Sequence, residues 1–98
     1  MTLTNNHIKT LCNFYKNTDY TQFRSCQAWV STHIFNSAYG VNFQLVKSYD
    51  TIVAFINLDT KQYIELGKWS RTTSKQVTQI YNALYSDFER LYCDVYNS

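Results

Sequence analysis

The chain has 98 residues, of which 45 % are apolar and 16 % are charged, and its formal net charge is +2. A chain of this length has room for one hydrophobic core, so the sequence predicts a single domain over residues 1–98 and excludes two. The apolar share excludes a disordered chain, and so small a net charge gives no general argument for binding a polyanion.

The first predicted element is a helix over residues 5–17. Its apolar positions recur at spacings of three and four along one face, at Ile8, Leu11, Cys12 and Tyr15. Thr4 is placed to cap its first turn, because a threonine oxygen accepts a hydrogen bond from the unpaired amides there. Residues 18–26 are polar and unpatterned, and they are interpreted as a connector.

Strands are predicted in the middle of the chain. Residues 27–35 fit a helical or an alternating pattern, and their β-branched and aromatic content, with the turn-like residues 36–40 that follow, favours a strand. Alternating apolar residues then predict three further strands, over residues 41–46, 51–58 and 62–66. Short turns join them, so we expect an antiparallel meander.

The last predicted element is a long amphipathic helix over residues 74–96. Its apolar stripe recurs at spacings of three and four, at Val77, Tyr81, Leu84, Phe88, Leu91 and Val95. Thr73 and Gln76 have the spacing of a capping box, and such a helix would be roughly 35 Å long at 1.5 Å per residue. Packing on its own sheet is the favoured role, and pairing of helices across a dimer is the alternative. The predicted fold class is therefore α+β: an N-terminal helix, a three- or four-stranded antiparallel sheet and this long C-terminal helix.

No catalytic or metal-binding pattern is recognisable. His7 and His33 belong to no metal-ligand spacing, and the two glycines are too few for a phosphate-binding loop. The three cysteines are widely spaced, which predicts reduced thiols in a cytosolic protein rather than a disulfide framework. No signal peptide or membrane span is recognisable either. We therefore expect a soluble cytoplasmic protein that is not an enzyme and has no metal and no cofactor.

The segment of residues 67–75, GKWSRTTSK, is the clearest candidate contact site. It places Lys68, Trp69, Arg71 and Lys75 at the start of a helix, where unpaired backbone amides favour anions. These residues predict a contact with a phosphate or an acidic surface, with Trp69 stacking on a base or filling a partner pocket. The alternative is purely structural: Trp69 closes the core, the hydroxyls cap the helix, and the cations stay in water. The structural role is favoured for Trp69 and Thr73, and Arg71 and Lys75 remain open.

Tyrosines provide a second argument for binding. The chain has nine tyrosines, too many for its small core, and exposed tyrosine is common in protein interfaces. Tyr49 and Tyr63 are predicted to contact a partner together with the cations of residues 67–75. Single-stranded nucleic acid could stack on the same rings, but such a site normally carries more positive charge.

Two segments give a partial resemblance to a known group of proteins. The run SYDTIVA at residues 48–54, followed by GKWSRTTSK at residues 67–75, resembles a pattern of small phage and prophage proteins of unknown activity, over about residues 41–80. The resemblance implies a phage-encoded, non-catalytic accessory protein that binds and inhibits a host defence protein. By analogy with inhibitors of CRISPR effectors, it would block a nuclease or its nucleic-acid site in the host cytoplasm. A nucleic-acid-binding module and a homodimer formed by the C-terminal helix are the two alternatives.

Overall fold

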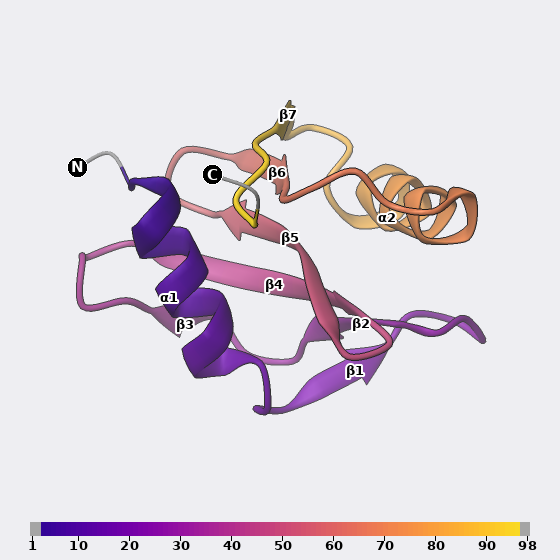
Figure 1. The fold of residues 1–98 in the computed structure, drawn as a ribbon, viewed down its shortest axis with the longest axis horizontal. Helices are drawn as coiled ribbons and strands as arrows, with labels where there is room; N and C mark the ends of the chain where they lie inside the picture. The colour runs from indigo at the N-terminus through magenta and orange to yellow at the C-terminus, as the bar shows by residue number, and fades with distance from the viewer. Residues whose placement is uncertain (1–2, 97–98) are drawn as a thin grey trace.

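The computed structural model describes residues 3–96 as two helices and a single sheet of seven strands (Figure 1). In chain order the elements are α1 (Asn5–Tyr15), β1 (Tyr20–Gln22), β2 (Ala28–Ser31), β3 (Phe35–Asn36), β4 (Asn42–Ser48), β5 (Thr51–Asn57), β6 (Gln62–Glu65), α2 (Arg71–Leu84) and β7 (Glu89–Tyr92). Neither helix within residues 3–96 is long and apolar enough to cross a membrane.

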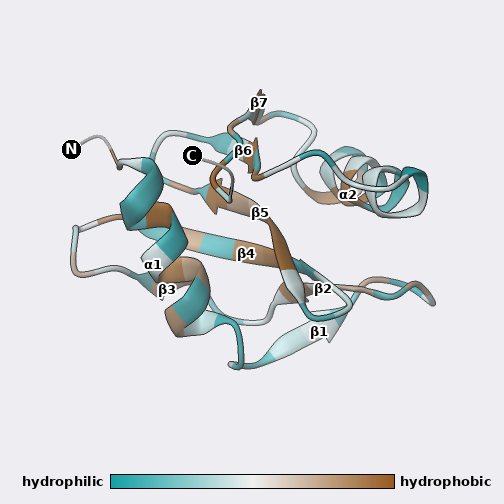
Figure 2. Cartoon of the chain, in the orientation of Figure 1, coloured by the Kyte–Doolittle hydropathy of each residue, from teal (hydrophilic) through white to brown (hydrophobic). Residues whose placement is uncertain are grey.

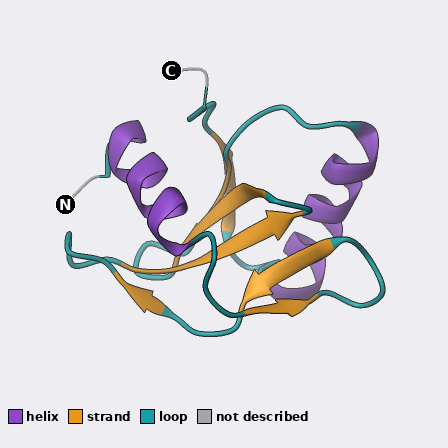
Figure 3. Ribbon diagram, turned by 60° about the horizontal axis from the view of Figure 1, so that its bottom comes forward, coloured by secondary structure: helices purple, strands orange, loops and turns teal. Residues whose placement is uncertain are grey.

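The strands follow the spatial order β1-β2-β4-β5-β6-β7, with β3 paired beside β4. All pairings are antiparallel except that of β6 with β7, which is parallel. The two helices are separated by the sheet (Figure 3). Because side chains alternate between the two faces of a strand, β4 and β5 contribute apolar residues to both helices. One core cluster lies against α1 and includes Phe43, Leu45 and Phe55, and the other lies against α2 and includes Val46 and Ile56.

The central strands and the first helix confirm the sequence predictions. Strand β5 is the most apolar element, as the largely brown colouring of Figure 2 shows, and its residues 52–57 are all buried. Strands β4 and β6 lie within one or two residues of the predicted bounds. Thr4 caps α1: its hydroxyl accepts from the His7 amide, and the His7 side chain accepts in return from the Thr4 amide.

The predicted sheet of three or four strands was wrong. The stretch interpreted as a connector contains β1, whose residues Tyr20, Thr21 and Gln22 are polar enough to lie at an edge. The strand predicted over residues 27–35 is two short strands, β2 and β3, which pair with different parts of β4. Neither β1 nor β3 is long enough to show an alternating pattern, so periodicity could not detect them.

The long C-terminal helix was also wrong. Helix α2 ends at Leu84, and the chain turns at residues 85–88 to form β7 beside β6. The apolar residues beyond the helix serve other contacts: Phe88 packs on the cluster near α2, whereas Val95 is buried in the cluster near α1. The regular spacing therefore combined residues of a helix, a turn and a strand. Burying the open edge of β6 is the tertiary gain that outweighs a longer helix.

The start of α2 differs from the predicted capping box. Ser70 is the N-cap, because its hydroxyl accepts from the Thr73 amide at 3.3 Å. Gln76 does not turn back to the helix start, and it instead accepts a hydrogen bond from the Ser48 hydroxyl at 3.1 Å. The helix thus begins at Arg71, three residues before the predicted start. Gln76, which was predicted to belong to the capping box, instead contacts β4.

Candidate functional site

The basic junction, which we define as residues 67–75 between β6 and α2, presents three cations on the first turns of α2. Arg71 is the first helical residue and Lys75 lies one turn later, so both side chains lie on the same side of the helix. Lys68 precedes the N-cap by two residues, and all three are exposed. The stripe that packs on the sheet, which includes Gln76, Val77 and Ile80, leaves this side of α2 facing solvent.

The charges of the basic junction are not balanced by the rest of the described chain. Within residues 3–96 none of its three cations takes part in an ion pair, and the first turn of α2 contains no acidic residue. Acids on adjoining elements are already paired, Glu65 with Arg90 at 2.6 Å and Asp50 with Lys16 at 3.4 Å. Cations near a helix start oppose the helix dipole, so the arrangement slightly destabilises α2. An anionic partner would relieve that repulsion.

The structure brings the turn that carries Tyr49 beside the basic junction. Tyr49 is 61 % exposed and adopts a left-handed backbone with φ 53° in the turn between β4 and β5. Its neighbour Ser48 lies against α2, with 3.4 Å between the hydroxyl oxygens of Ser48 and Thr73. The segments of residues 48–54 and 67–75 therefore meet at the start of α2. Sequence analysis missed this contact, because no pattern links Ser48 to residues 25 or more positions away.

Trp69 takes the structural role. It is half-buried and packs against residues of both core clusters, with its ring centroid 6.1 Å from that of Tyr96. The indole lies over Gly67 so closely that a Cβ on that glycine would be 3.0 Å from the ring. What remains accessible lines a shallow hollow together with Glu65, Lys68 and Tyr92. Trp69 is thus not presented for stacking on a base.

The prediction that Tyr63 contacts a partner was wrong. Its side chain is fully buried between β6 and α2, and its hydroxyl donates to the Val77 carbonyl at 2.8 Å. Burial raises the pKa of the Tyr63 phenol well above its ordinary value, so the hydroxyl keeps its proton and remains a donor. Its alternating position in a short strand did not reveal which face it occupies. The corrected candidate surface consists of Lys68, Arg71, Lys75 and Tyr49, and we call it the basic surface.

The nucleophilic and basic side chains elsewhere serve structural contacts. Burial raises the pKa of the Cys12 thiol to about 12, so the reactive thiolate is suppressed there. His7 is occupied in the cap of α1 and stacks on Tyr39, with ring centroids 4.2 Å apart. Among the described residues no three His, Cys, Asp or Glu side chains are grouped so that they could hold a metal ion.

Comparisons with known proteins give a family but no activity. No curated protein and no solved structure matches the chain. One family model matches residues 9–94, a span that reaches from α1 through β7 and includes the whole basic surface. Since this match covers most of the sequence, the chain belongs to the family described as a family of unknown function, DUF8033.

Proposed function

We propose that the protein is a non-catalytic binding protein whose basic surface contacts an acidic surface of a partner protein. In the setting implied by the resemblance of residues 48–54 and 67–75, the protein is encoded by a phage and acts in the host cytoplasm. The partner is then a host defence protein, such as a CRISPR effector nuclease, which it inhibits by occupying the nuclease or its nucleic-acid site. The observation that carries the proposal is the presence of three exposed cations in residues 67–75 that have no ion pair within residues 3–96, with the turn that carries the exposed Tyr49 held against the same helix.

The chemistry of this surface supports binding to a protein. Arginine and tyrosine are enriched among the residues that contribute most to interface affinity, because both combine a large contact area with hydrogen bonding. Arg71 offers a planar donor group suited to carboxylates, and Tyr49 provides an exposed ring on the turn next to Ser48, whose hydroxyl lies against Thr73 of α2. The cations at the start of α2 oppose the helix dipole in the free protein. An acidic partner surface would stabilise them in the complex.

Nucleic acid is the second candidate partner, favoured by the same three cations. Against it stands the position of Trp69, whose indole packs inside and over Gly67 rather than outward. Binding through three phosphate contacts would give a log–log salt slope of about −2 to −3, because each contact releases a counterion. An acidic protein surface carries no condensed counterion atmosphere to release, so binding through the same three cations would depend less on salt.

A homodimer through the C-terminal helix loses its structural basis. The residues expected to form the seam on α2, such as Val77, are buried against the sheet, and residues 89–92 are a strand. We therefore do not retain that alternative.

The test is capture of partners from a bacterial host lysate, with and without nuclease treatment, followed by mass spectrometry. We expect one stoichiometric host protein that survives nuclease treatment. The charge-reversed variant Arg71→Glu with Lys75→Glu should lose this protein by at least tenfold, because two attractive contacts become repulsive.

The matched control is Lys9→Glu with Lys61→Glu, which changes the net charge by the same amount at α1 and at the turn between β5 and β6. It should retain the partner. Loss of binding in both double variants would point to net charge rather than a site. Recovery of nucleic acid alone would replace this proposal with the second candidate.

A further inference from the structure

Strand β1 forms an open edge of the sheet. It is the first strand in the spatial order, and it forms the lower edge of the sheet in Figure 1. Its register with β2 places Thr21 opposite Val30 and Gln22 opposite Trp29. Thr21 and Gln22 are exposed, and this strand carries neither proline nor lysine, the residues that commonly protect edges.

The backbone groups that face this open edge can be assigned from the hydrogen bonds at both ends of β1. The Phe23 amide donates to the Ala28 carbonyl at 2.8 Å, and the Thr32 amide donates to the Asp19 carbonyl at 3.0 Å. Hydrogen-bonded pairs alternate along an antiparallel ladder, so the backbone N–H and C=O groups of Asp19, Thr21 and Phe23 face β2. The N–H and C=O groups of Tyr20 and Gln22 therefore point away from the sheet, and no turn or loop backbone bond within residues 3–96 uses them.

Two copies of this edge are complementary to each other. In an antiparallel pairing about a two-fold axis through Thr21, Tyr20 of each copy lies opposite Gln22 of the other. Both residues expose their backbone groups, so the pair exchanges four hydrogen bonds across the axis. If the register shifts by two residues in either direction, either the two Tyr20 residues or the two Gln22 residues lie opposite each other. The remaining outward-facing residue of each copy then has no outward-facing partner in β1.

Charges at the ends of β1 agree with the same register. Asp19 of one copy lies opposite Phe23 of the other, and the Arg24 guanidinium lies over that Phe23 ring, 4.7 Å from its centroid. Arg24 takes part in no ion pair within the described chain. The Asp19 side chain is 85 % exposed, and its ionic neighbour within residues 3–96 is His33, at 3.9 Å. The pairing would thus form two Asp19–Arg24 ion pairs, one on each side of the axis.

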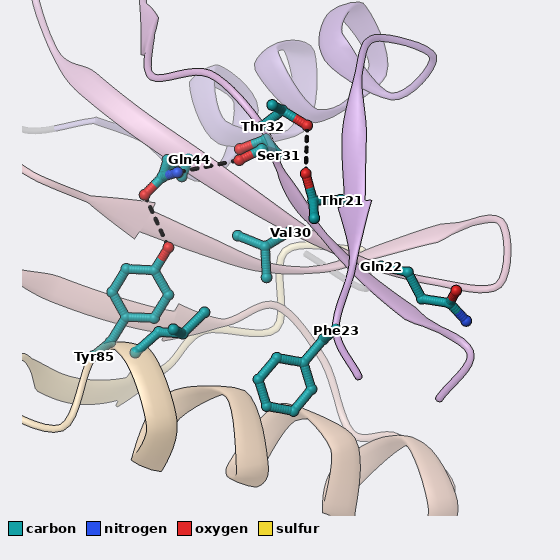
Figure 4. A pocket seen from close by; sticks show the side chains of 9 residues that line it. Thr21, Gln22, Phe23, Val30, Ser31, Thr32, Gln44 and Tyr85 are labelled. Carbon is teal, nitrogen blue, oxygen red and sulfur yellow. Dashed lines mark hydrogen bonds between the residues drawn. The ribbon is translucent and has the colours of Figure 1, made fainter. Parts of the chain in front are cut away.

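A hollow beside β1 provides room for the second strand's side chains. It has a volume of about 430 Å³ and lies between β1 and the C-terminal end of α2 (Figure 4). Thr21 and Phe23 line it from β1, and Tyr85 and Leu84 line it from α2, with Leu84 52 % exposed. Its lining contains no charged residue, so a paired copy meets no repulsion there.

From these observations we infer that the chain forms a symmetric dimer by antiparallel pairing of β1 with β1 of a second copy, which extends the sheet across the two-fold axis. The inference does not depend on the proposed function, since none of Lys68, Arg71, Lys75 and Tyr49 takes part in the pairing. The interface is small and polar, so we expect the dimer to dissociate on dilution.

The first test is sedimentation velocity over a concentration series reaching the millimolar range, with amide hydrogen exchange followed by NMR. We expect a mass that rises to twice that of one chain. At the same concentrations the amides of Tyr20 and Gln22 should become protected at least tenfold, while the amide of Thr21, already bonded to β2, changes little. A chain that remains a monomer at every concentration would overturn the inference.

Two sets of variants distinguish this edge from any other contact. Gln22→Pro removes an outward amide and spares the bonds to β2, so it should weaken the dimer at least tenfold, whereas Gln22→Thr keeps the amide and the dimer. Asp19→Arg and Arg24→Asp should each weaken it, and the double exchange should restore it while leaving the fold unchanged by circular dichroism. A dimer insensitive to the proline, or single exchanges that the double does not rescue, would place the contact elsewhere. Capture of an extended segment of another protein by a monomeric chain would assign the edge to a different partner.

Discussion

The centre and the rim of this sheet are stabilised in different ways. In the centre, formed by β4 and β5, apolar residues on both faces of the sheet are buried under the two helices, such as Phe43 on the α1 side and Ile56 on the α2 side. The rim, which we define as the basic junction and β7, lies beyond β6 and is largely exposed. There a few individual hydrogen bonds hold the chain, such as the bond from the Glu89 amide to the Lys61 carbonyl at 2.9 Å.

This difference separates residues that determine the fold from residues available for binding. Apolar burial is proportional to the area removed from water, so the centre supplies most of the stability. The rim contributes less, and it can carry unbalanced charge without unfolding the domain. We expect substitutions in the centre to change the free energy of unfolding, and substitutions in the basic surface to change binding.

The largest effect is expected in the centre, for Phe55→Ala. Phe55 is fully buried and stacks on Phe43 with ring centroids 4.9 Å apart. Truncation leaves a cavity and should lower the free energy of unfolding by about 3–5 kcal/mol. Urea denaturation followed by circular dichroism measures it. The control is Phe14→Ala, whose side chain is 76 % exposed and whose loss should cost less than about 0.5 kcal/mol. Similar losses for both variants would contradict the two-sided core.

High pH should weaken the interior on both faces of the sheet. Burial raises the pKa of the Cys12 thiol in α1 from 9.0 to about 12, and that of the Tyr85 phenol at the end of α2 from 10.0 to about 12. Both groups ionise more readily in the unfolded chain, so the stabilisation is intact below pH 9 and is lost as the pH rises toward 12. Each group contributes a slope of about 1.4 kcal/mol per pH unit within its window.

Urea denaturation at pH 7 to 11 measures this decline. In Cys12→Ala the fall in stability should begin near pH 10 instead of pH 9, because the buried groups with a raised pKa are then tyrosines, such as Tyr85, whose ordinary pKa is 10.0. Cys26→Ala is the control, since its half-buried thiol lies in the loop between β1 and β2, and it should leave the onset unchanged. An onset that does not move in Cys12→Ala would contradict the assignment of the decline near pH 9 to the buried Cys12 thiol.

At the rim, Arg90→Ala should detach β7. The Arg90 guanidinium donates to Glu65 at 2.6 Å and to Thr78 at 2.8 Å, and it lies 5.3 Å from the centroid of the Tyr81 ring. Its removal leaves the partly buried Glu65 carboxylate unpaired, and we expect a loss of about 1–3 kcal/mol. Hydrogen exchange of the Cys93 and Val95 amides, which donate to β6 and Leu66, should accelerate first. Glu89→Ala on the same strand is the control, and equal effects in both would assign no special role to Arg90.

The sequence could predict the centre because burial there imposes a period. Alternation marks β4, β5 and β6, and α1 is marked by an apolar face and by Thr4 at its cap. The same criterion failed beyond Leu84, where residues 88, 91 and 95 continue the spacing of the helix although Leu91 lies in β7 and Phe88 and Val95 pack on opposite faces of the sheet. The turn at Ser86 and Asp87, two residue types common in turns, was the available signal that the helix had ended.

The candidate site was predictable in part. Lys68, Arg71 and Lys75 were recognisable as cations near a helix start, and the structure confirms that they are exposed. The burial of Tyr63 and the approach of Ser48 to Thr73 depend on which strands become neighbours, and a single sequence contains no local pattern for that. The short edge strand β1 was hidden for the same reason, because three polar residues form a strand only when β2 is beside them.

The smallest effect on stability is expected for Arg71→Glu, a substitution in the rim. It should raise the free energy of unfolding while it weakens binding of the partner. An acidic residue at the first position of α2 interacts favourably with the helix dipole and relieves the repulsion with Lys75, so unfolding should require about 0.3–1 kcal/mol more. The same change should weaken capture of the partner at least tenfold. Arg71→Gln should fall between the two in both measurements, and the gain in stability should shrink in 1 M salt, where the charges are screened. A variant that loses stability and binding together would indicate that Arg71 is required for folding. A gain in stability with unchanged binding would exclude Arg71 from the basic surface, because its charge would then destabilise the helix without contributing to the affinity for the partner.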